Sequence, residues 1–158
     1  MSGLVRPVRP EDLDAICQIE EASFSVPWKR SDYEALVGLE DAVFLAVCDE
    51  TGRAVAGFGC IRQAADEGDL LNIAVREDRR GGGYGTQLLA ALLRRAEENG
   101  AERIFLEVRE SNVPAIRMYE AAGFEKVGVR KGYYTCPVED ALLMRRIREE
   151  RDNVRNGI

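Results

Sequence analysis

Histidine is absent from the 158-residue sequence. Its absence removes the side chain that most often serves as a general base and the one that most often binds a transition metal. Any acid–base chemistry must therefore come from Asp, Glu, Tyr, Cys or Lys. We also expect no metal site in this protein.

Cysteine is scarce, and no two cysteines form a C-x-x-C pair: the positions are Cys17, Cys48, Cys60 and Cys136. This spacing predicts neither a zinc site nor a compact disulfide framework, so the thiols are expected to be reduced and mostly buried. The sequence also lacks an apolar signal segment near its start, and it has no run of the ~18–20 apolar residues that a membrane span needs. We therefore expect a cytoplasmic protein without a membrane partner.

Positive charge is the lesser of the two charges, with 22 Lys and Arg against 28 Asp and Glu and a formal net charge of −6. A general nucleic-acid binder usually has a basic face, so direct binding to nucleic acid is not expected. An acidic surface suits a positively charged partner, although ordinary solvation explains it equally well. The length and the hydrophobic fraction of 46% indicate one globular domain with a substantial core.

The pattern of apolar and polar residues predicts an α/β domain. Strands are expected at 4–8, 42–48, 54–64, 69–75, 103–108, 127–134 and 141–147. Helices are expected from residue 10, from an N-cap at Ser31 through residue 39, from residue 84 to a stop at Gly100, and from a cap at Ser111 or Asn112 to Gly123. A hairpin followed by alternating strands and helices implies a mixed sheet with helices on its faces.

Four glycines lie within five residues between an expected strand and an expected helix: Gly81, Gly82, Gly83 and Gly85. The first turn of a helix carries N–H groups without an internal partner, and glycines would let a phosphate or pyrophosphate approach them. The alternative is a plain tight turn in which the glycines only supply positive φ. A Walker A loop would need Gly-Lys-Ser/Thr where Thr86 follows Gly85, and the spacing of a dinucleotide-binding fingerprint also fails.

The pattern Arg80-x-x-Gly83-x-Gly85 instead resembles the Gln/Arg-x-x-Gly-x-Gly/Ala motif of the GCN5-related N-acetyltransferases, the GNAT family. The resemblance covers nearly the whole chain. "LLNIAV", "IFLEVRESNVPAIRMYEAAGF" and "GYYTCPVEDALLM" are similar to the RimI-type branch, which acetylates the N-terminal α-amino group of a ribosomal protein. The resemblance implies a single-domain GNAT acyl-CoA N-acyltransferase fold over residues 1–148, with a charged tail at 149–158. The implied sheet is mixed and mostly antiparallel, with helices on both faces.

The resemblance implies acetyl-CoA as the acetyl-donor cosubstrate, with no metal. Its pyrophosphate would lie on the loop formed by Arg80, Gly81, Gly82, Gly83, Tyr84, Gly85 and Thr86. The backbone of the preceding strand end, Ile73, Ala74 and Val75, would bond the acetyl carbonyl and the pantetheine amides. Asn112 would form a hydrogen bond with coenzyme A, and a local role as helix N-cap is compatible with that contact.

Glu107 is the candidate general base. In "FLEVR", alternation places Phe105 and Glu107 on one face of a strand, and Leu106 and Val108 on the other. A carboxylate in a mainly apolar strand is costly to bury, which suggests function. The residues alone leave open a salt bridge with Arg109 or another arginine. The resemblance carries the general base of the RimI type onto Glu107, acting on the amine directly or through water.

Tyr119, in "AIRMYEAAGF", is the candidate general acid. Its phenol is protonated at neutral pH and can donate to a thiolate. From the residues alone, an ordinary aromatic side chain packed beside Ile116 and Met118 is the stronger interpretation. The motif Tyr-Glu-x-x-Gly-Phe matches the family position of the acid, so the resemblance implies that Tyr119 contacts the coenzyme and protonates its thiolate.

The resemblance also implies contacts to the acceptor. Related N-terminal acetyltransferases hold the peptide backbone with tyrosines at the loop that corresponds to "GYYT", which gives Tyr133 and Tyr134. Glu67, in "DEGDLLN", is expected near the same groove. The segment "YYTCPVEDA" is shorter than its counterpart in bacterial RimI, which leaves the acceptor itself open.

The leading hypothesis is an acetyl-CoA-dependent protein N-terminal acetyltransferase that transfers the acetyl group directly in a ternary complex. No cysteine adjoins the motifs and no histidine exists to activate one, which argues against a cysteine acyl carrier. The partner would be a protein or peptide N-terminus, and the acidic surface is compatible with a basic ribosomal protein. The alternatives are a lysine or small-molecule acetyltransferase and a non-catalytic acetyl-CoA-binding module; Glu107 and Tyr119 together argue against the module.

Overall fold

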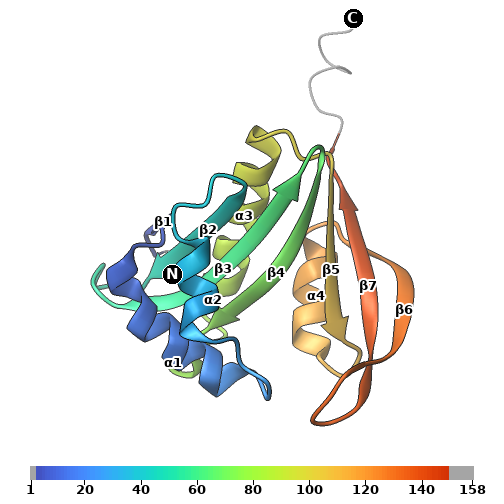
Figure 1. The fold of residues 1–158 in the computed structure, drawn as a ribbon, viewed down its shortest axis with the longest axis horizontal. Coiled ribbons are helices and arrows are strands. Elements are labelled where there is room, and N and C mark those ends of the chain that lie inside the picture. Colours follow the sequence, from blue (N-terminus) through green and yellow to red (C-terminus); the bar gives the residue numbers. More distant parts are fainter. Residues whose placement is uncertain (1–2, 150–158) are drawn as a thin grey trace, which may run out of the picture.

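A computed structural model describes residues 3–149 of the chain (Figure 1). The bounds of its elements are β1 Val5–Pro7, η1 Pro10–Asp12, α1 Leu13–Ser23, α2 Arg30–Leu36, β2 Ala42–Cys48, β3 Val55–Ala64, β4 Glu67–Val75, η2 Glu77–Arg79, α3 Tyr84–Glu98, β5 Arg103–Arg109, α4 Val113–Ala121, β6 Glu125–Tyr134 and β7 Glu139–Ile147, where η marks a 3₁₀ turn. Apart from Glu149, the predicted tail at 149–158 lies outside the described residues.

Seven strands form one sheet in the order β1-β2-β3-β4-β5-β7-β6. Neighbouring strands run antiparallel except β4 and β5, which are parallel, so the predicted mixed and mostly antiparallel sheet is confirmed. β2 has the predicted bounds, and each of the other strands differs from its predicted range by one or two residues at an end. The strand predictions succeed because the apolar segments are short and bounded by turn residues.

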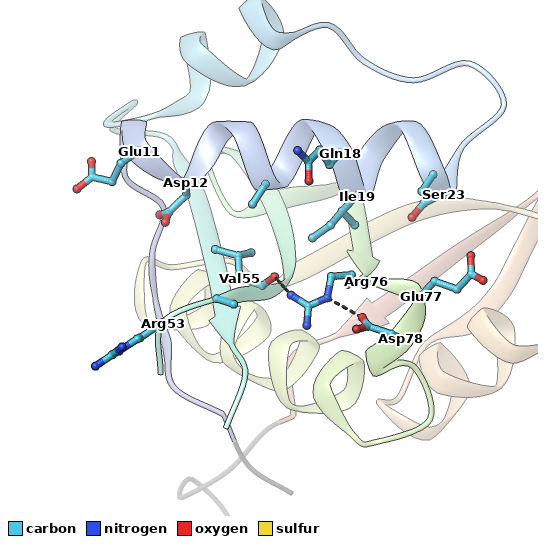
Figure 2. A pocket seen from close by; sticks show the side chains of 13 residues that line it. Glu11, Asp12, Gln18, Ile19, Ser23, Arg53, Val55, Arg76, Glu77 and Asp78 are labelled. Atoms are coloured by element: carbon cyan, nitrogen blue, oxygen red, sulfur yellow. Dashed lines mark hydrogen bonds and ion pairs between the residues drawn. The ribbon is translucent and has the colours of Figure 1, made fainter. Parts of the chain in front are cut away.

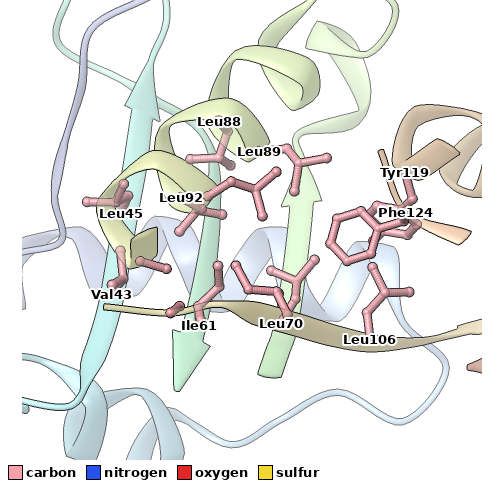
Figure 3. Packing of buried hydrophobic residues seen from close by; sticks show 14 of the residues in the cluster. Val43, Leu45, Ile61, Leu70, Leu88, Leu89, Leu92, Leu106, Tyr119 and Phe124 are labelled. Atoms are coloured by element: carbon pink, nitrogen blue, oxygen red, sulfur yellow. The ribbon is translucent and has the colours of Figure 1, made fainter. Parts of the chain in front are cut away.

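Helices cover both faces of the sheet, as predicted (Figure 1). On one face, α3 buries Leu88 and Leu92 against the strand residues Leu45 and Leu70, and Tyr119 of α4 belongs to the same cluster (Figure 3). On the opposite face, α1 and α2 pack on β2 and β3 and form a second apolar cluster. Its members include Leu13, Ile16, Ile19, Tyr33, Leu36, Phe44 and Phe58. The two clusters thus place the sheet between two layers of helices.

The second helix begins and ends at residues other than those predicted. α2 spans Arg30–Leu36 with Lys29 as its N-cap, so the Ser31 cap and the end at residue 39 are wrong. The carboxylate of Asp32 accepts the Lys29 backbone amide at 2.9 Å. An acidic side chain in the first turn thus satisfies the helix start, a role that was assigned to the serine hydroxyl.

β4 and β5 diverge soon after they meet. Their parallel pairing covers only Glu67↔Arg103, Gly68↔Ile104 and Asp69↔Phe105. Leu71 is then an extra residue in β4, because Leu70 pairs with Ile61 of β3 whereas Asn72 pairs with the adjacent Cys60. A bulge of this kind bends its strand. The two strands therefore separate toward the carboxyl end of β4, and the separation is visible in Figure 1.

Within residues 3–149, the helices are too short or too polar to serve as a membrane span.

Candidate active site

Beyond Asp69↔Phe105, β4 no longer pairs with β5, and we call this separation of the two strands the opening. The Arg76 amide donates to Ala56 of β3 at 2.7 Å, and hydrogen bonding alternates along an antiparallel pair. The peptide groups of Ala74 therefore face β3, while those of Ile73 and Val75 face the opening. Of the three residues predicted to bond the acyl chain, two are oriented for that contact, and the expectation for the Ala74 backbone is wrong.

Arg80 fixes the end of this strand. Its Nε donates to the Val75 carbonyl oxygen at 3.0 Å, and its terminal nitrogen donates to Ser23 Oγ at 3.1 Å. The side chain thus joins β4 to the C-terminal end of α1. Arg80 stands at the entrance to the glycine loop with its guanidinium largely exposed, next to the loop amides.

The glycine loop presents a row of free backbone amides. Gly81 and Gly83 have φ of +80° and +89°, which glycine adopts at no steric cost, and a Cβ added at either position would meet nothing within 4 Å. Among the described residues, no acceptor bonds the amides of residues 81–86, which include the first turn of α3. The loop is therefore open and electropositive at its surface, as an anion site requires.

The last residues of the motif differ in what they contribute. A Cβ at Gly85 would lie 3.2 Å from Met118 Sδ of α4, so this glycine allows close packing of α3 on α4. The Tyr84 side chain is buried, and its hydroxyl donates to Glu50 at 2.7 Å in the β2–β3 turn. Only the backbone of Tyr84 can reach a ligand on the loop, so a side-chain contact is excluded. Thr86 is exposed on the first turn of α3.

Glu107 lies on the face of β5 that carries α1 and α2. Leu106 and Val108 are buried on the α3 side, which confirms the predicted alternation. The Glu107 carboxylate pairs with Arg130 of β6, with 2.8 Å between Oε2 and Nε. The salt bridge left open by the sequence thus exists, and its partner is Arg130, whereas Arg109 pairs with Glu139 at 3.2 Å.

Tyr119 lies on the opposite side of the sheet from Glu107. Its ring is buried in the α3–α4 cluster and packs edge-to-face on Phe124, with 5.8 Å between centroids (Figure 3). Burial raises the pKa of the Tyr119 phenol, and the nearby Tyr134 phenol adds to the effect. The phenol therefore stays protonated at neutral pH, which is the state that a proton donor needs.

Asn112 is the N-cap of α4, since its Oδ1 accepts the Ala115 amide at 3.3 Å. Of the two caps considered, the structure has Asn112 rather than Ser111. Asn112 is exposed at the end of β5, on the side where β4 and β5 separate. Its Nδ2 has no acceptor within residues 3–149 while Oδ1 caps the helix, so the local role and a ligand contact are compatible.

Tyr133 and Tyr134 end β6 and meet edge-to-face, with centroids 5.1 Å apart. The Tyr133 ring is 50% exposed, whereas the guanidinium of Arg109 lies 4.5 Å from the centroid of the Tyr134 ring. Arg109 also donates to the Thr135 carbonyl at 2.9 Å and to Ser25 Oγ at 3.3 Å. This arginine, which sequence reasoning considered only as a partner for Glu107, thus connects the β6–β7 turn to the α1–α2 segment.

Glu67 lies far from these tyrosines. It starts β4, pairs in register with Arg103 at the beginning of β5, and forms an ion pair with that side chain at 3.2 Å. Tyr134, in contrast, neighbours Arg109 at the other end of β5, about 20 Å along a strand of this length. The expectation that Glu67 shares a groove with Tyr133 and Tyr134 is therefore wrong.

A buried polar network behind the opening was missed by sequence reasoning. The Glu20 carboxylate of α1 is 1% exposed and accepts the Tyr33 hydroxyl, the Trp28 amide at 2.9 Å and the Asn72 side-chain amide at 3.1 Å. Burial raises the pKa of Glu20, and these bonds oppose the shift. The network joins α1, α2 and the α1–α2 segment to β4 beside its bulge. The sequence contained a signal for this network, because Glu20 lies four residues after Ile16 and thus on the apolar face of the helix.

Replacing Tyr33 by Phe is expected to lower the free energy of unfolding by about 1–3 kcal/mol, because it leaves the buried Glu20 and Asn72 groups without a partner. Urea unfolding monitored by circular dichroism measures the change. Tyr133→Phe removes the same hydroxyl from an exposed ring and should change stability by less than about 0.5 kcal/mol. Equal effects of the two substitutions would contradict the importance of the network.

A hollow of about 480 Å³ lies between α1 and the segment after β4 (Figure 2). Arg76 crosses it, donating to the Val55 carbonyl at 3.2 Å and to Asp78 at 2.6 Å. Its guanidinium is thereby neutralised, and none of the predicted site residues lines the hollow. Among residues 3–149, no cluster of three or more acidic or cysteine side chains is arranged to hold a metal ion.

Known proteins resemble this chain along most of its length. Residues 13–124 match the model of the Acetyltransferase (GNAT) family. An Escherichia coli (strain K12) protein named ribosomal protein bS18-alanine N-acetyltransferase is 35% identical over 135 residues, or 84% of this chain and 89% of that protein. A Bacillus subtilis (strain 168) protein, given the same name provisionally, is 38% identical over 141 residues, or 89% of this chain and 92% of that protein. The crystal structure of the Escherichia coli ribosomal-protein-S18-alanine N-acetyltransferase has a TM-score of 0.82 at 30% identity, covering 94% of this chain and 97% of that one.

Proposed function

The chain belongs to the acetyltransferase (GNAT) family, and from this membership we propose that it moves the acetyl group of acetyl-CoA to the N-terminal α-amino group of a protein. One observation carries the proposal most of the way: the pairing of β4 with β5 ends at Asp69↔Phe105, and the unpaired end of β4 is followed in the chain by the row of free amides at residues 81–86. This arrangement fits a long acyl carrier that has an anionic group partway along it.

The residues around the opening fit acetyl-CoA part by part. The amides of residues 81–86 would hold the pyrophosphate, with Arg80 beside them. The peptide groups of Ile73 and the amide of Val75, which face away from β3, would bond the acyl arm, and Asn112 would donate to the coenzyme from the β5 side. When bound, acetyl-CoA supplies an activated thioester, and direct transfer in a ternary complex needs no metal.

Glu107 and Tyr119 would divide the proton transfers between the two sides of the sheet. As the amine nitrogen bonds to the acetyl carbon, Glu107 takes the proton that the nitrogen loses. As the carbon–sulfur bond breaks, Tyr119 gives its proton to the departing thiolate. The opposite placement of the two side chains supports these roles, because the amine and the thiolate must lie on opposite sides of the thioester.

For the acceptor we propose the N-terminus of a ribosomal protein, by analogy with the relatives named for bS18. Tyr133 and Tyr134 would contact its backbone from one side, and the α1–α2 segment near Ser25 would form the other side. The net charge of −6 suits a basic protein, and a ribosomal acceptor would place the reaction in the cytoplasm. No direct contact with nucleic acid is required.

The test is mass spectrometry of synthetic peptides incubated with the enzyme and acetyl-CoA. The peptides differ in their N-terminal residue, each carries an internal lysine, and N-terminally blocked copies serve as controls. We expect acetylation of the free α-amino group and none of the blocked copies. Modification of the internal lysine alone would point to a lysine acetyltransferase, and no modification of any peptide would point to a small-molecule acceptor or to a binding module.

Tyr119→Phe is expected to lower kcat about tenfold at pH 7 while the affinity for acetyl-CoA stays close to that of the wild type. The effect is moderate because a thiol of pKa ~8.5 leaves fairly well without assistance. Ring packing on Phe124 is kept, so urea unfolding should show little change. Steady-state kinetics at saturating acetyl-CoA measure kcat, and an unchanged value would remove Tyr119 as the acid.

A further inference from the structure

The two members of the Glu107–Arg130 ion pair differ in how firmly the fold holds them. Glu107 lies in the middle of β5, which pairs with β7 without interruption from Arg103↔Ile147 to Arg109↔Ala141. Its side chain is 29% exposed. The backbone that carries the carboxylate is therefore held in place at one side of the opening.

Arg130 is held much more loosely. β6 is an edge strand, paired only with β7, and its register is lost between Arg130↔Ala141 and Tyr134↔Glu139. Three residues of β6 there oppose the single residue Asp140 of β7. The Arg130 side chain is 55% exposed at the edge of this irregular segment.

The guanidinium of Arg130 also has a second contact partner, the ring of Tyr133. It lies 5.8 Å from the centroid of the Tyr133 ring, within the range of a cation–π contact. A half-exposed ion pair contributes little net stability, because solvent and counterions replace most of it. Movement of Arg130 from the Glu107 carboxylate toward Tyr133 therefore costs little, whereas the backbone of Glu107 stays in the β5–β7 ladder.

We propose that Arg130 is a displaceable counter-ion for Glu107, and that the positively charged N-terminus of the acceptor takes its place on the carboxylate. This inference rests on the proposed function of Glu107. In the acceptor-free enzyme, Arg130 covers the oxygen that must receive a proton. The α-ammonium group of the acceptor then exchanges one cation for another, so Glu107 never stands unpaired.

The exchange makes access to the base depend on the charge of the acceptor's N-terminus, while the affinity of the wild type for the peptide changes little. A peptide whose N-terminus is neutral cannot replace Arg130, so the Glu107–Arg130 pair remains closed over the base. A peptide with an α-ammonium group gains a contact to Glu107 but displaces an existing one, so its net gain in the wild type is small. Without Arg130, the contact between the α-ammonium group and Glu107 would strengthen peptide binding in full, because no existing ion pair would be lost. Arg130 is thus a positioning residue that acts through Glu107.

The test compares the binding of two probe peptides to the enzyme–CoA complex by calorimetry at pH 6.5, where an α-amino group of pKa ~7.7–8 is protonated. One peptide begins with alanine, and the other carries a propionyl group in place of that alanine. In the wild type we expect similar affinities. In Arg130→Gln, the alanine peptide should bind about fivefold or more tightly than the propionyl peptide, since the ammonium now meets an unpaired carboxylate.

Matched variants separate this role from a general effect of charge. Lys131→Gln removes a cation from the next position of β6, where Lys131 pairs with Asp140 at 3.2 Å, and should keep the wild-type ratio. Arg130→Lys keeps a cation and should lie near the wild type. Glu107→Gln combined with Arg130→Gln should abolish the preference for the alanine peptide.

An unchanged affinity ratio in Arg130→Gln, with both peptides bound, would overturn the exchange and leave the proposed function standing. Equal weakening of both peptides would also overturn it, because that result describes a fixed structural contact. If the wild-type complex binds neither peptide, the proposed acceptor is wrong and the exchange is wrong with it.

Discussion

Glu107→Gln is expected to lower kcat about 100- to 10,000-fold, the range that a well-placed general base contributes. The substitution keeps the size and shape of the side chain but removes its capacity to accept a proton from the attacking amine. The acetyl-CoA site is formed by other residues, so the affinity for acetyl-CoA should change less than about twofold. Stopped reactions analysed by mass spectrometry give kcat, and calorimetry gives the affinity.

The matched control is Glu102→Gln. Glu102 directly precedes β5 and is ion-paired with Arg148 at 3.4 Å. Like Glu107, it is therefore a glutamate that pairs with an arginine, but it lies outside the proposed site. Its loss should leave kcat within about twofold of the wild type, as for surface substitutions away from the site. Turnover of Glu107→Gln at the rate of this control would show that the amine loses its proton by another route.

Gly83→Asp is expected to abolish the stabilisation of the protein by acetyl-CoA. At a ligand concentration of 100 Kd, a bound ligand stabilises the folded state by about 2.7 kcal/mol, which raises the Tm of a domain of this size by about 5–10 °C. A carboxylate at Gly83 would stand beside the amides that we expect to hold pyrophosphate, and it would repel that group. Differential scanning fluorimetry with and without acetyl-CoA measures the shift.

Gly83→Asn is the control for shape and backbone strain. The φ of +89° at Gly83 strains any side chain, but Asp and Asn tolerate this region about equally and have nearly the same size. Both variants should therefore melt at a similar, lowered temperature without ligand. Only the Asn variant should keep most of the ligand-induced rise. If both variants lose the ligand-induced rise in melting temperature, the cause is the altered backbone and not the charge of Asp. If both keep it, the anion does not bind at this loop.

The sequence was sufficient to predict the fold because its elements are short, well separated and supported by local signals. The apolar segment 42–48 became β2 with no change of bounds, and Asn112, one of the two predicted caps, caps α4. The start of α2 was missed because Asp32, inside the helix, satisfies the Lys29 amide. Local propensity favours serine as an N-cap, whereas the observed start depends on a contact between the side chain of Asp32 and the backbone of Lys29.

The site residues divide in a similar way. Strand alternation predicted the face of Glu107, since it depends only on period two. Its partner could not be predicted, because Arg130 lies 23 residues further along the chain and reaches Glu107 across β7 from β6. The same limit applies to Glu67, whose position depends on the register of the parallel pair β4–β5. Tyr84 lies in the glycine motif, but the direction of its side chain is set by the helix and by Glu50.

The bulge at Leu71 has a consequence for how this site could arise and be lost. On either side of Leu71, β3 and β4 pair as they would in an unbroken ladder, from Leu70↔Ile61 to Asn72↔Cys60. A chain one residue shorter could keep every one of those pairs, but β4 would then be straight and could continue alongside β5. The separation that we propose for the donor therefore depends on the length of the chain at one point. We expect substitutions at Leu71 to reshape the opening, and deletion of this one residue to close it while the β3–β4 pairs are kept.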